Sequence, residues 1–141
     1  MLRATMRITF NDKREPMKID YLKEYPEYVR QTAEMVYQTF VVDTKSTKTF
    51  EDVVQFFTQQ EVGELPITLI AYKQEKVCGT VSIFKNDLSI RPQYSPWLAS
   101  LVVLQEERKQ GIAKELIMKV TEIVAQLGFD ELYLRTETAS D

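Results

Sequence analysis

The sequence predicts a mixed α/β domain with a central sheet that is mostly antiparallel. Two apolar segments, residues 67–72 and 77–84, are separated by four polar residues, which is the pattern of an antiparallel hairpin. A third apolar segment, residues 97–103, precedes a long amphipathic helix and a short apolar segment at residues 132–135. A strand, a helix and a strand at this spacing predict a parallel pair joined by a right-handed crossover.

Length and composition fit one globular unit. The chain has 141 residues, of which 44% are hydrophobic and 28% are charged, as in an ordinary soluble domain. This length allows one core to form without disulfides or metals. Because no internal repeat, low-complexity segment or linker interrupts the sequence, we expect a single domain over residues 1–141.

Charge and missing residue types exclude several classes of function. The formal net charge of −3 argues against a general nucleic-acid-binding protein and is compatible with a cationic amine as partner. The sequence contains no histidine, which excludes histidine-based triads and the usual zinc clusters, so we expect no metal. A single cysteine, no signal-peptide core and no run of about 20 apolar residues favour a cytoplasmic protein with no membrane partner.

The first part of the chain predicts two strands and two helices. Residues 5–10 and 17–21 alternate polar and apolar side chains, so each is predicted as a strand, and the two could pair as a hairpin. A proline suited to a first turn opens a predicted helix over about residues 26–41. Thr49 is the predicted N-cap, with a partial capping box, of a second helix that ends near residue 60.

The last helix has the most regular pattern in the chain. Residues 112–127 carry apolar side chains on one face and polar side chains on the other. Gly128 follows directly and suits the C-cap position.

The start of this last helix carries the strongest functional signal. The first turn of a helix leaves backbone N–H groups without partners and adds partial positive charge, so phosphate or pyrophosphate is its natural occupant. Gly111 would allow a ligand close to the backbone, and Ala113 is the next smallest residue on the same face. Arg108, Lys109 and Lys114 add positive charge beside this position.

The residues Arg108-Lys109-Gln110-Gly111-Ile112-Ala113 resemble the acyl-CoA pyrophosphate loop of the GNAT superfamily of N-acetyltransferases. That pattern is Gln or Arg, two residues, Gly, one residue, then Gly or Ala; Arg108, Gly111 and Ala113 match it. The six residues alone also fit an ordinary strand, turn and helix with a glycine at the turn. The order of elements favours the family, and residues 95–103 are similar to its fourth strand.

The resemblance covers residues 17–138 and implies the acyl-CoA N-acyltransferase (GNAT) fold. It implies transfer of an acetyl group from acetyl-CoA to a primary amine by direct attack in a ternary complex. It further implies that the fourth strand binds the pantetheine arm and that the following loop cradles the pyrophosphate. The cofactor-binding residues implied are Leu101, Val102, Val103, Arg108, Lys109, Gln110, Gly111, Ile112, Ala113 and Lys114.

The resemblance implies a small-molecule or peptide amine as acceptor but identifies no catalytic residue. Many members carry a glutamate on the fourth strand as general base, whereas residues 98–100 here contain no carboxylate. The usual proton donor is a tyrosine from a C-terminal helix, and Tyr133 lies on a different element. Attack by an already neutral amine needs positioning alone.

The sequence also departs from the family at its C-terminal end. The family continues after residue 138 with a fourth helix and two strands, so we expect a C-terminally truncated version of the fold. A fragment, a layer supplied by another chain, and reduced function all remain open. The strand at residues 132–135 would have an exposed edge, which would allow a homodimer.

Other interpretations stay open beside the transferase. One is a non-catalytic acyl-CoA-binding or dimerisation module; a structural domain without cofactor is least favoured. Cys78 as an acetyl-carrying nucleophile is disfavoured, because no histidine could activate it and cysteine is commonly buried. Phe84, Tyr94 and Trp97 could line an acceptor pocket, although packing roles are favoured for at least two of them.

Overall fold

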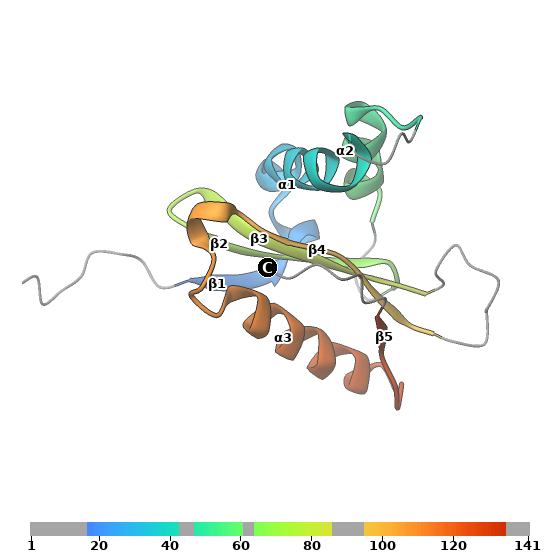
Figure 1. Ribbon diagram of the computed structural model, residues 1–141. Helices are drawn as coiled ribbons and strands as arrows, with labels where there is room; N and C mark the ends of the chain where they lie inside the picture. The colour runs from blue at the N-terminus through green and yellow to red at the C-terminus, as the bar shows by residue number, and fades with distance from the viewer. Residues whose placement is uncertain (1–16, 43–46, 61–63, 86–94, 135–141) are drawn as a thin grey trace, which may run out of the picture.

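Five strands form one sheet in the order β1-β2-β3-β4-β5 (Figure 1). The computed structural model describes residues 17–42, 47–60, 64–85 and 95–134. Neighbouring strands from β1 to β4 are antiparallel, and β5 is parallel to β4. This confirms the predicted fold class. The strands are β1 (Lys18–Tyr21), β2 (Ile67–Lys73), β3 (Lys76–Phe84), β4 (Trp97–Val103) and β5 (Tyr133–Leu134).

Helices cover both faces of the sheet (Figure 1). On one face lie α1 (Val29–Val36) and α2 (Phe50–Thr58), and on the other lies α3 (Ile112–Gln126). The helix predicted over residues 26–41 is present as three successive geometries: the 3-10 turn η2 (Pro26–Tyr28), α1, and the π-helical turn η3 (Tyr37–Val41). Two further 3-10 turns are η1 (Leu22–Glu24) and η5 (Gln105–Glu107).

The sheet separates two cores, and this explains why β2 is apolar along its whole length. Leu69 and Ala71 belong to the core under α3, whereas Ile70 and Tyr72 belong to the core under α1 and α2. Successive side chains of a strand point to opposite faces, so a strand buried on both faces becomes a continuous apolar run. The α3 core also holds the buried face of α3 itself, including Leu116.

The predicted helix ends at Thr49 and Gly128 are confirmed by hydrogen bonds. The Asp52 N–H donates to Thr49 Oγ1 at 3.1 Å and the Thr49 N–H donates to Asp52 Oδ2 at 2.8 Å, so the capping box is complete. Gly128 has φ of 93°, and its N–H donates to the Ala125 carbonyl at 3.0 Å. The Phe129 N–H donates to the Val124 carbonyl at 3.1 Å, which completes a Schellman motif.

Some predictions concern parts of the chain outside the described residues. These are the strand at residues 5–10, its hairpin with β1, and Tyr94. The segment predicted as a strand at 132–135 is described as far as Leu134, and β5 forms an edge of the described sheet. Within the described ranges, no helix is long and apolar enough to span a membrane.

Candidate functional site

The helix start predicted at Gly111 has an open geometry. Gly111 is the N-cap of α3 with φ of 81° and ψ of 11°, and no side chain caps this end. A Cβ built on Gly111 would meet no atom within 4 Å, so the space beside the first turn is open. The Glu115 N–H donates to the Gly111 carbonyl at 3.0 Å and starts the helical ladder. The N–H groups of the first turn therefore face a position where an anion could lie.

Gly79 of β3 allows the start of α3 to pack close to the sheet. A Cβ at Gly79 would lie 3.1 Å from Ile112 Cγ2 and 3.3 Å from Leu116 Cδ1. The first turn of α3 thus packs directly on the backbone of β3, which only glycine permits without a shift. The predicted loop residues Ile112 and Ala113 differ in burial: Ile112 belongs to the core, and Ala113 is half-buried beside it.

The end of β4 directs part of its backbone away from β3. The Leu104 N–H donates to the Cys78 carbonyl at 2.9 Å, so Thr80 and Val102 form a hydrogen-bonded pair. Val103 and Gly79 form the neighbouring non-hydrogen-bonded pair. The N–H and carbonyl of Val103 therefore point away from β3, towards the β5 side. The described part of β5 pairs only with Trp97 and Leu98, at the other end of β4.

Arg108 joins this strand end to the loop. Its Nε donates to the Val103 carbonyl at 3.2 Å, so Arg108 lies where the outward edge of β4 meets the start of α3. Lys109 has φ of 66°, and Lys109, Gln110 and Lys114 are exposed around the first turn. The structure therefore brings the predicted strand residues and the predicted loop residues together at one end of the sheet.

A β-bulge interrupts β4, and sequence reasoning missed it. The register shifts between Thr80 and Ser82, so Val81 lies opposite both Ser100 and Leu101. Ser100 has φ of 56°, in the left-handed region that favours glycine. Bulges often lie next to active sites because they change the direction of neighbouring groups. A serine in this conformation has no signature in sequence.

Glu107 is the second residue that sequence reasoning missed. It is the last residue of η5 and is only 7% exposed. Its carboxylate lies 3.0 Å from Lys73 Nζ and 3.3 Å from Lys76 Nζ, and the Gln110 amide donates to it at 3.4 Å. The hydrogen bond from Lys73 lowers the pKa of Glu107 below its ordinary range, and Lys76 acts in the same direction.

Polar groups also gather on the α2 side of the sheet, near residues 98–100. Ser82 pairs with Ala99 across the sheet, and its hydroxyl lies 2.8 Å from the Thr68 hydroxyl. The Gln60 amide donates to Thr68 Oγ1 at 2.7 Å. Gln60, Thr68 and Ser82 are all buried, and these hydrogen bonds satisfy their polar side chains. Among the described residues, no carboxylate takes part in this hydrogen-bonded group.

The remaining candidates have packing roles in the structure. Cys78 is fully buried, and burial raises the pKa of its thiol, which keeps it in its unreactive form. The Phe84 ring packs against Phe56 with centroids 5.7 Å apart, and Trp97 packs against Tyr133 at 5.5 Å. Within the described ranges, no cluster of three metal-ligating side chains is present.

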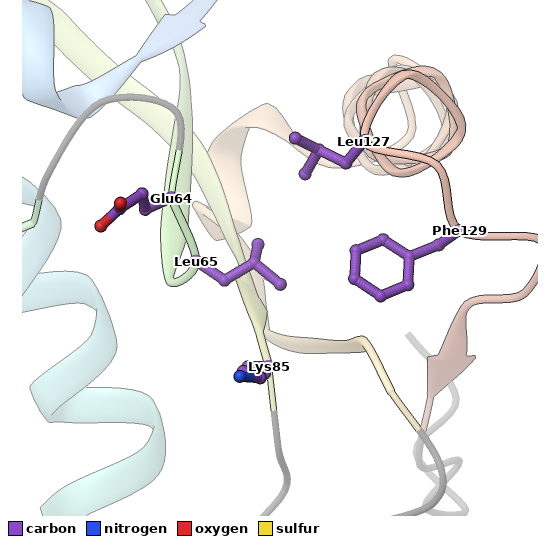
Figure 2. Close-up of a pocket in the computed structure, with 5 residues that line it drawn as sticks. All are labelled: Glu64, Leu65, Lys85, Leu127 and Phe129. Atoms are coloured by element: carbon purple, nitrogen blue, oxygen red, sulfur yellow. The ribbon is translucent and has the colours of Figure 1, made fainter.

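Two surface hollows are lined by residues outside the α3 N-terminus. One, of about 340 Å³, is lined by Leu65, Leu127 and Phe129, which point into it, with Glu64 and Lys85 at its rim (Figure 2). The other, of about 440 Å³, lies beside the β2–β3 turn and is lined by Lys18, Tyr25, Tyr28, Tyr72, Gln74 and Glu75. Neither hollow is lined by a predicted cofactor-binding residue.

Comparison with solved structures shows the class of fold. The aminoglycoside N-acetyltransferase AAC(6')-Iy in complex with CoA is 16% identical, with TM-score 0.72, covering 92% of this chain and 82% of that one. Glucosamine-6-phosphate N-acetyltransferase from Arabidopsis thaliana is 16% identical, with TM-score 0.66 and coverages of 88% and 84%. AAC(6')-Iy with the bisubstrate analogue CoA-S-monomethyl-acetylneamine is 20% identical, with TM-score 0.64 and coverages of 88% and 82%.

The family follows from the sequence itself. A sequence model of the Acetyltransferase (GNAT) family matches residues 20–141, which is most of the chain, so the chain belongs to this family. It is an acetyl-CoA-dependent acyltransferase by this membership. A search of curated protein sequences found no match. The open first turn of α3, the basic residues near it in sequence and the outward β4 edge offer backbone donors and positive charge, which are groups that can bind an anion.

Proposed function

We propose that this chain transfers the acetyl group of acetyl-CoA directly to a primary amine while both substrates are bound. One observation carries the proposal: the outward backbone of Val103 and the open first turn of α3 meet at Arg108. The first turn can bind the diphosphate, and the strand edge can bind the amides of the pantetheine arm as an added strand would. Each set of donors suits the part of CoA that would reach it.

Residues 108–114 would bind the diphosphate mainly through backbone N–H groups. Exposed Lys109 and Lys114 would add positive charge, and Gly111 leaves the approach clear. Leu101 lies at the β-bulge beside Val103, so the pantetheine arm would run along β4 towards the bulge. Val102 uses its backbone in the ladder with Thr80, so any contact it makes with ligand would be through its side chain.

The chemistry requires little of the chain beyond binding and orientation. Acetyl-CoA supplies an activated thioester. The nitrogen of a neutral amine attacks the thioester carbon, the C–N bond forms, and the C–S bond breaks to release the CoA thiolate. A backbone N–H of β4 would stabilise the charge on the oxygen during this step, as preorganised donors do elsewhere.

The proposal includes no side-chain base for the amine, because the described residues of the fourth strand, β4, offer none. Residues 98–100 hold no carboxylate, and the hydroxyls of Thr68 and Ser82 are hydrogen-bonded to each other. We infer that the amine loses its proton to solvent before it attacks. The proton that the nitrogen sheds after attack would pass to solvent or to the leaving thiolate.

The acceptor is a small-molecule or peptide amine in this proposal. The aminoglycoside enzyme is bound to an analogue in which CoA and acetylneamine form one molecule, which supports simultaneous binding of donor and acceptor. The helices α1 and α2 lie on the face that carries Ser82 and would form one side of the acceptor site. We further propose a cytoplasmic single domain with no nucleic-acid partner and the β5 edge as its dimer contact.

Turnover of acetyl-CoA with a panel of amines tests the proposal. Aminoglycosides, polyamines, amino acids and short peptides would be offered singly, and thiol release would be measured with and without each amine. We expect release that requires an amine and yields the acetylated amine. Binding of acetyl-CoA without such release would support the alternative, a non-catalytic acyl-CoA-binding module, which the missing carboxylate favours.

A further inference from the structure

We propose that Glu107 is a positioning residue that fixes the candidate diphosphate-binding loop against the β2–β3 turn. This inference rests on the proposed function, because it concerns the loop assigned there to CoA. Glu107 ends η5 and immediately precedes Arg108, so its position sets where the loop begins. It would contact no substrate and would act through the backbone of residues 108–114.

The carboxylate of Glu107 is held from several sides. Oε1 lies 3.0 Å from Lys73 Nζ and Oε2 lies 3.3 Å from Lys76 Nζ, so both oxygens are engaged by the hairpin. The Gln110 amide donates to Oε1 at 3.4 Å from within the loop itself. The side chain of Glu107 is 10% exposed and that of Lys73 is 21% exposed. A charge as buried as this is stable only when it is paired and hydrogen-bonded.

The two lysines are themselves fixed by α1 through the turn between them. The Gln31 amide donates to the Glu75 carbonyl at 3.1 Å, and the Val77 N–H donates to Gln31 Oε1 at 2.9 Å. Gln74 and Glu75 both have positive φ, at 50° and 65°, so the turn has one defined shape. Contacts therefore run without a break from α1 through the hairpin to the loop.

The loop is thus held at both ends. Glu107 holds its start on the β2–β3 turn, and Ile112 holds its end on Gly79 of β3. Between these positions, Lys109 and Gly111 have left-handed φ values of 66° and 81°. A loop that presents several N–H groups to one anion needs fixed ends, because each group must be in place before the ligand arrives.

Charge alone predicts the opposite effect from positioning. Replacing Glu107 by glutamine removes one negative charge beside the loop. It leaves Lys73 without the Glu107 carboxylate and Lys76 paired, among the described residues, with Glu106 alone, so the added net positive charge would attract an anion more strongly. If Glu107 acts by holding the loop, the same change weakens CoA binding. The sign of the effect of Glu107→Gln therefore separates the two roles.

The experiment compares Glu107→Gln with Glu106→Gln as the matched control. Glu106 is the preceding residue, is exposed, and pairs only with Lys76 at 3.3 Å among the described residues. Calorimetry would give Kd for CoA and for pantetheine, which lacks the diphosphate. Amide hydrogen exchange would report the loop in the absence of ligand. The double variant Glu107→Gln with Lys73→Met removes the buried pair together and guards against a single variant that fails to fold.

We expect Glu107→Gln to weaken CoA binding about tenfold, as for the loss of charge-assisted hydrogen bonds, and to speed exchange across residues 108–114. Pantetheine binding and the Glu106→Gln variant should stay within about twofold of wild type, and the double variant should lose CoA affinity as well. Unchanged or tighter CoA binding with unchanged loop exchange overturns the inference. A wild-type chain that binds no CoA overturns the proposed function instead, and loop exchange alone then decides whether Glu107 holds the loop.

Discussion

A glycine with positive φ lies at each end of α3, but only the C-terminal end is closed by hydrogen bonds. Gly111 at its start and Gly128 after its end have φ values of 81° and 93°. At the C-terminal end, the N–H groups of Gly128 and Phe129 donate to helix carbonyls at 3.0 and 3.1 Å, so this end is closed. At the N-terminal end, no side chain caps the helix.

This difference separates a structural helix end from a candidate binding site. Unsatisfied groups at a helix end need a partner from side chains, water or ligand. The C-terminal end finds partners within its own chain. The N-terminal end instead has the exposed residues Arg108, Lys109 and Lys114 next to it in sequence, and their positive charge favours an anionic ligand there.

Glutamate at each glycine provides the largest contrast. Both variants place a side chain at a left-handed φ, which costs about 1–2 kcal/mol of folding stability at either position. Gly111→Glu also puts a carboxylate where the diphosphate would lie, so we expect acetyl-CoA affinity to fall about 100-fold. Gly128→Glu should leave affinity unchanged. Calorimetric titration of both variants checks this, and equal affinities would show that the α3 start is not the site.

Gly79→Val changes the strand residue on which the N-terminal end of α3 packs. A Cβ at this position would lie 3.1 Å from Ile112 Cγ2 and 3.3 Å from Leu116 Cδ1, so the larger valine side chain requires these side chains at the start of α3 to shift. Overpacking of this kind costs about 1–3 kcal/mol in the free energy of unfolding, which urea denaturation would measure. We expect weaker acetyl-CoA binding as well. Unchanged stability would mean that α3 does not pack as closely as described.

Thr49→Ala tests a helix start that is closed. At the start of α2, the Thr49 hydroxyl accepts from the Asp52 N–H and the Asp52 carboxylate accepts from the Thr49 N–H. Removing this cap should cost about 1 kcal/mol of stability. Because the first turn of α2 carries the carboxylates of Glu51 and Asp52 and no predicted cofactor-binding residue, acetyl-CoA affinity should not change. Wild type and variant would be compared at the same number of degrees below their own Tm. A loss of affinity under these conditions would contradict the assignment of the site to α3.

The smallest expected effect is the loss of folding stability at acidic pH. The pKa of Glu107 is lowered by Lys73 and Lys76, and that of exposed Glu106 is lowered by its own backbone N–H and by Lys76. A lowered folded-state pKa means that the ionised form stabilises the fold. This stabilisation is fully present above the ordinary glutamate pKa of about 4.3 and is lost as pH falls below it.

Urea denaturation at pH 6 and pH 3.5 would measure this dependence. Glu107→Gln should be less stable than wild type at the higher pH and should lose less stability between the two values. The groups that face Glu107 are Lys73, Lys76, Glu106 and Gln110, and the lysines keep their charge throughout this range. Parallel pH dependences for both proteins would show that Glu107 is not paired in solution.

Local patterns predicted most of the sheet and the helix ends. The strands from 67 to 103 and the last helix follow from periodicity, and the caps at Thr49 and Gly128 follow from the chemistry of those residues. The predicted loop and strand residues do meet in space, because a parallel strand, helix and strand bring them together. Their role in binding CoA is a prediction that the experiments above test.

Features that depend on distant residues were not predictable from the sequence. Nothing in the local sequence marks Glu107 as buried, because its partners Lys73 and Lys76 lie on the β2–β3 hairpin. The bulge at Ser100 depends on pairing with β3 and uses a residue that is unusual at positive φ. The buried contact between Thr68 and Ser82 likewise arises from strand register. Each requires tertiary structure that no local window contains.

The central claim is that the open start of α3 binds the diphosphate of acetyl-CoA. The most direct measurement is a nitrogen–proton correlation spectrum of the chain during titration with CoA, with assigned amide resonances. The account predicts that the amides of residues 111–114 shift strongly, as groups that gain a hydrogen bond to an anion do, while the Gly128 amide stays in place. Saturation with CoA that leaves the amides of residues 111–114 unmoved would contradict it.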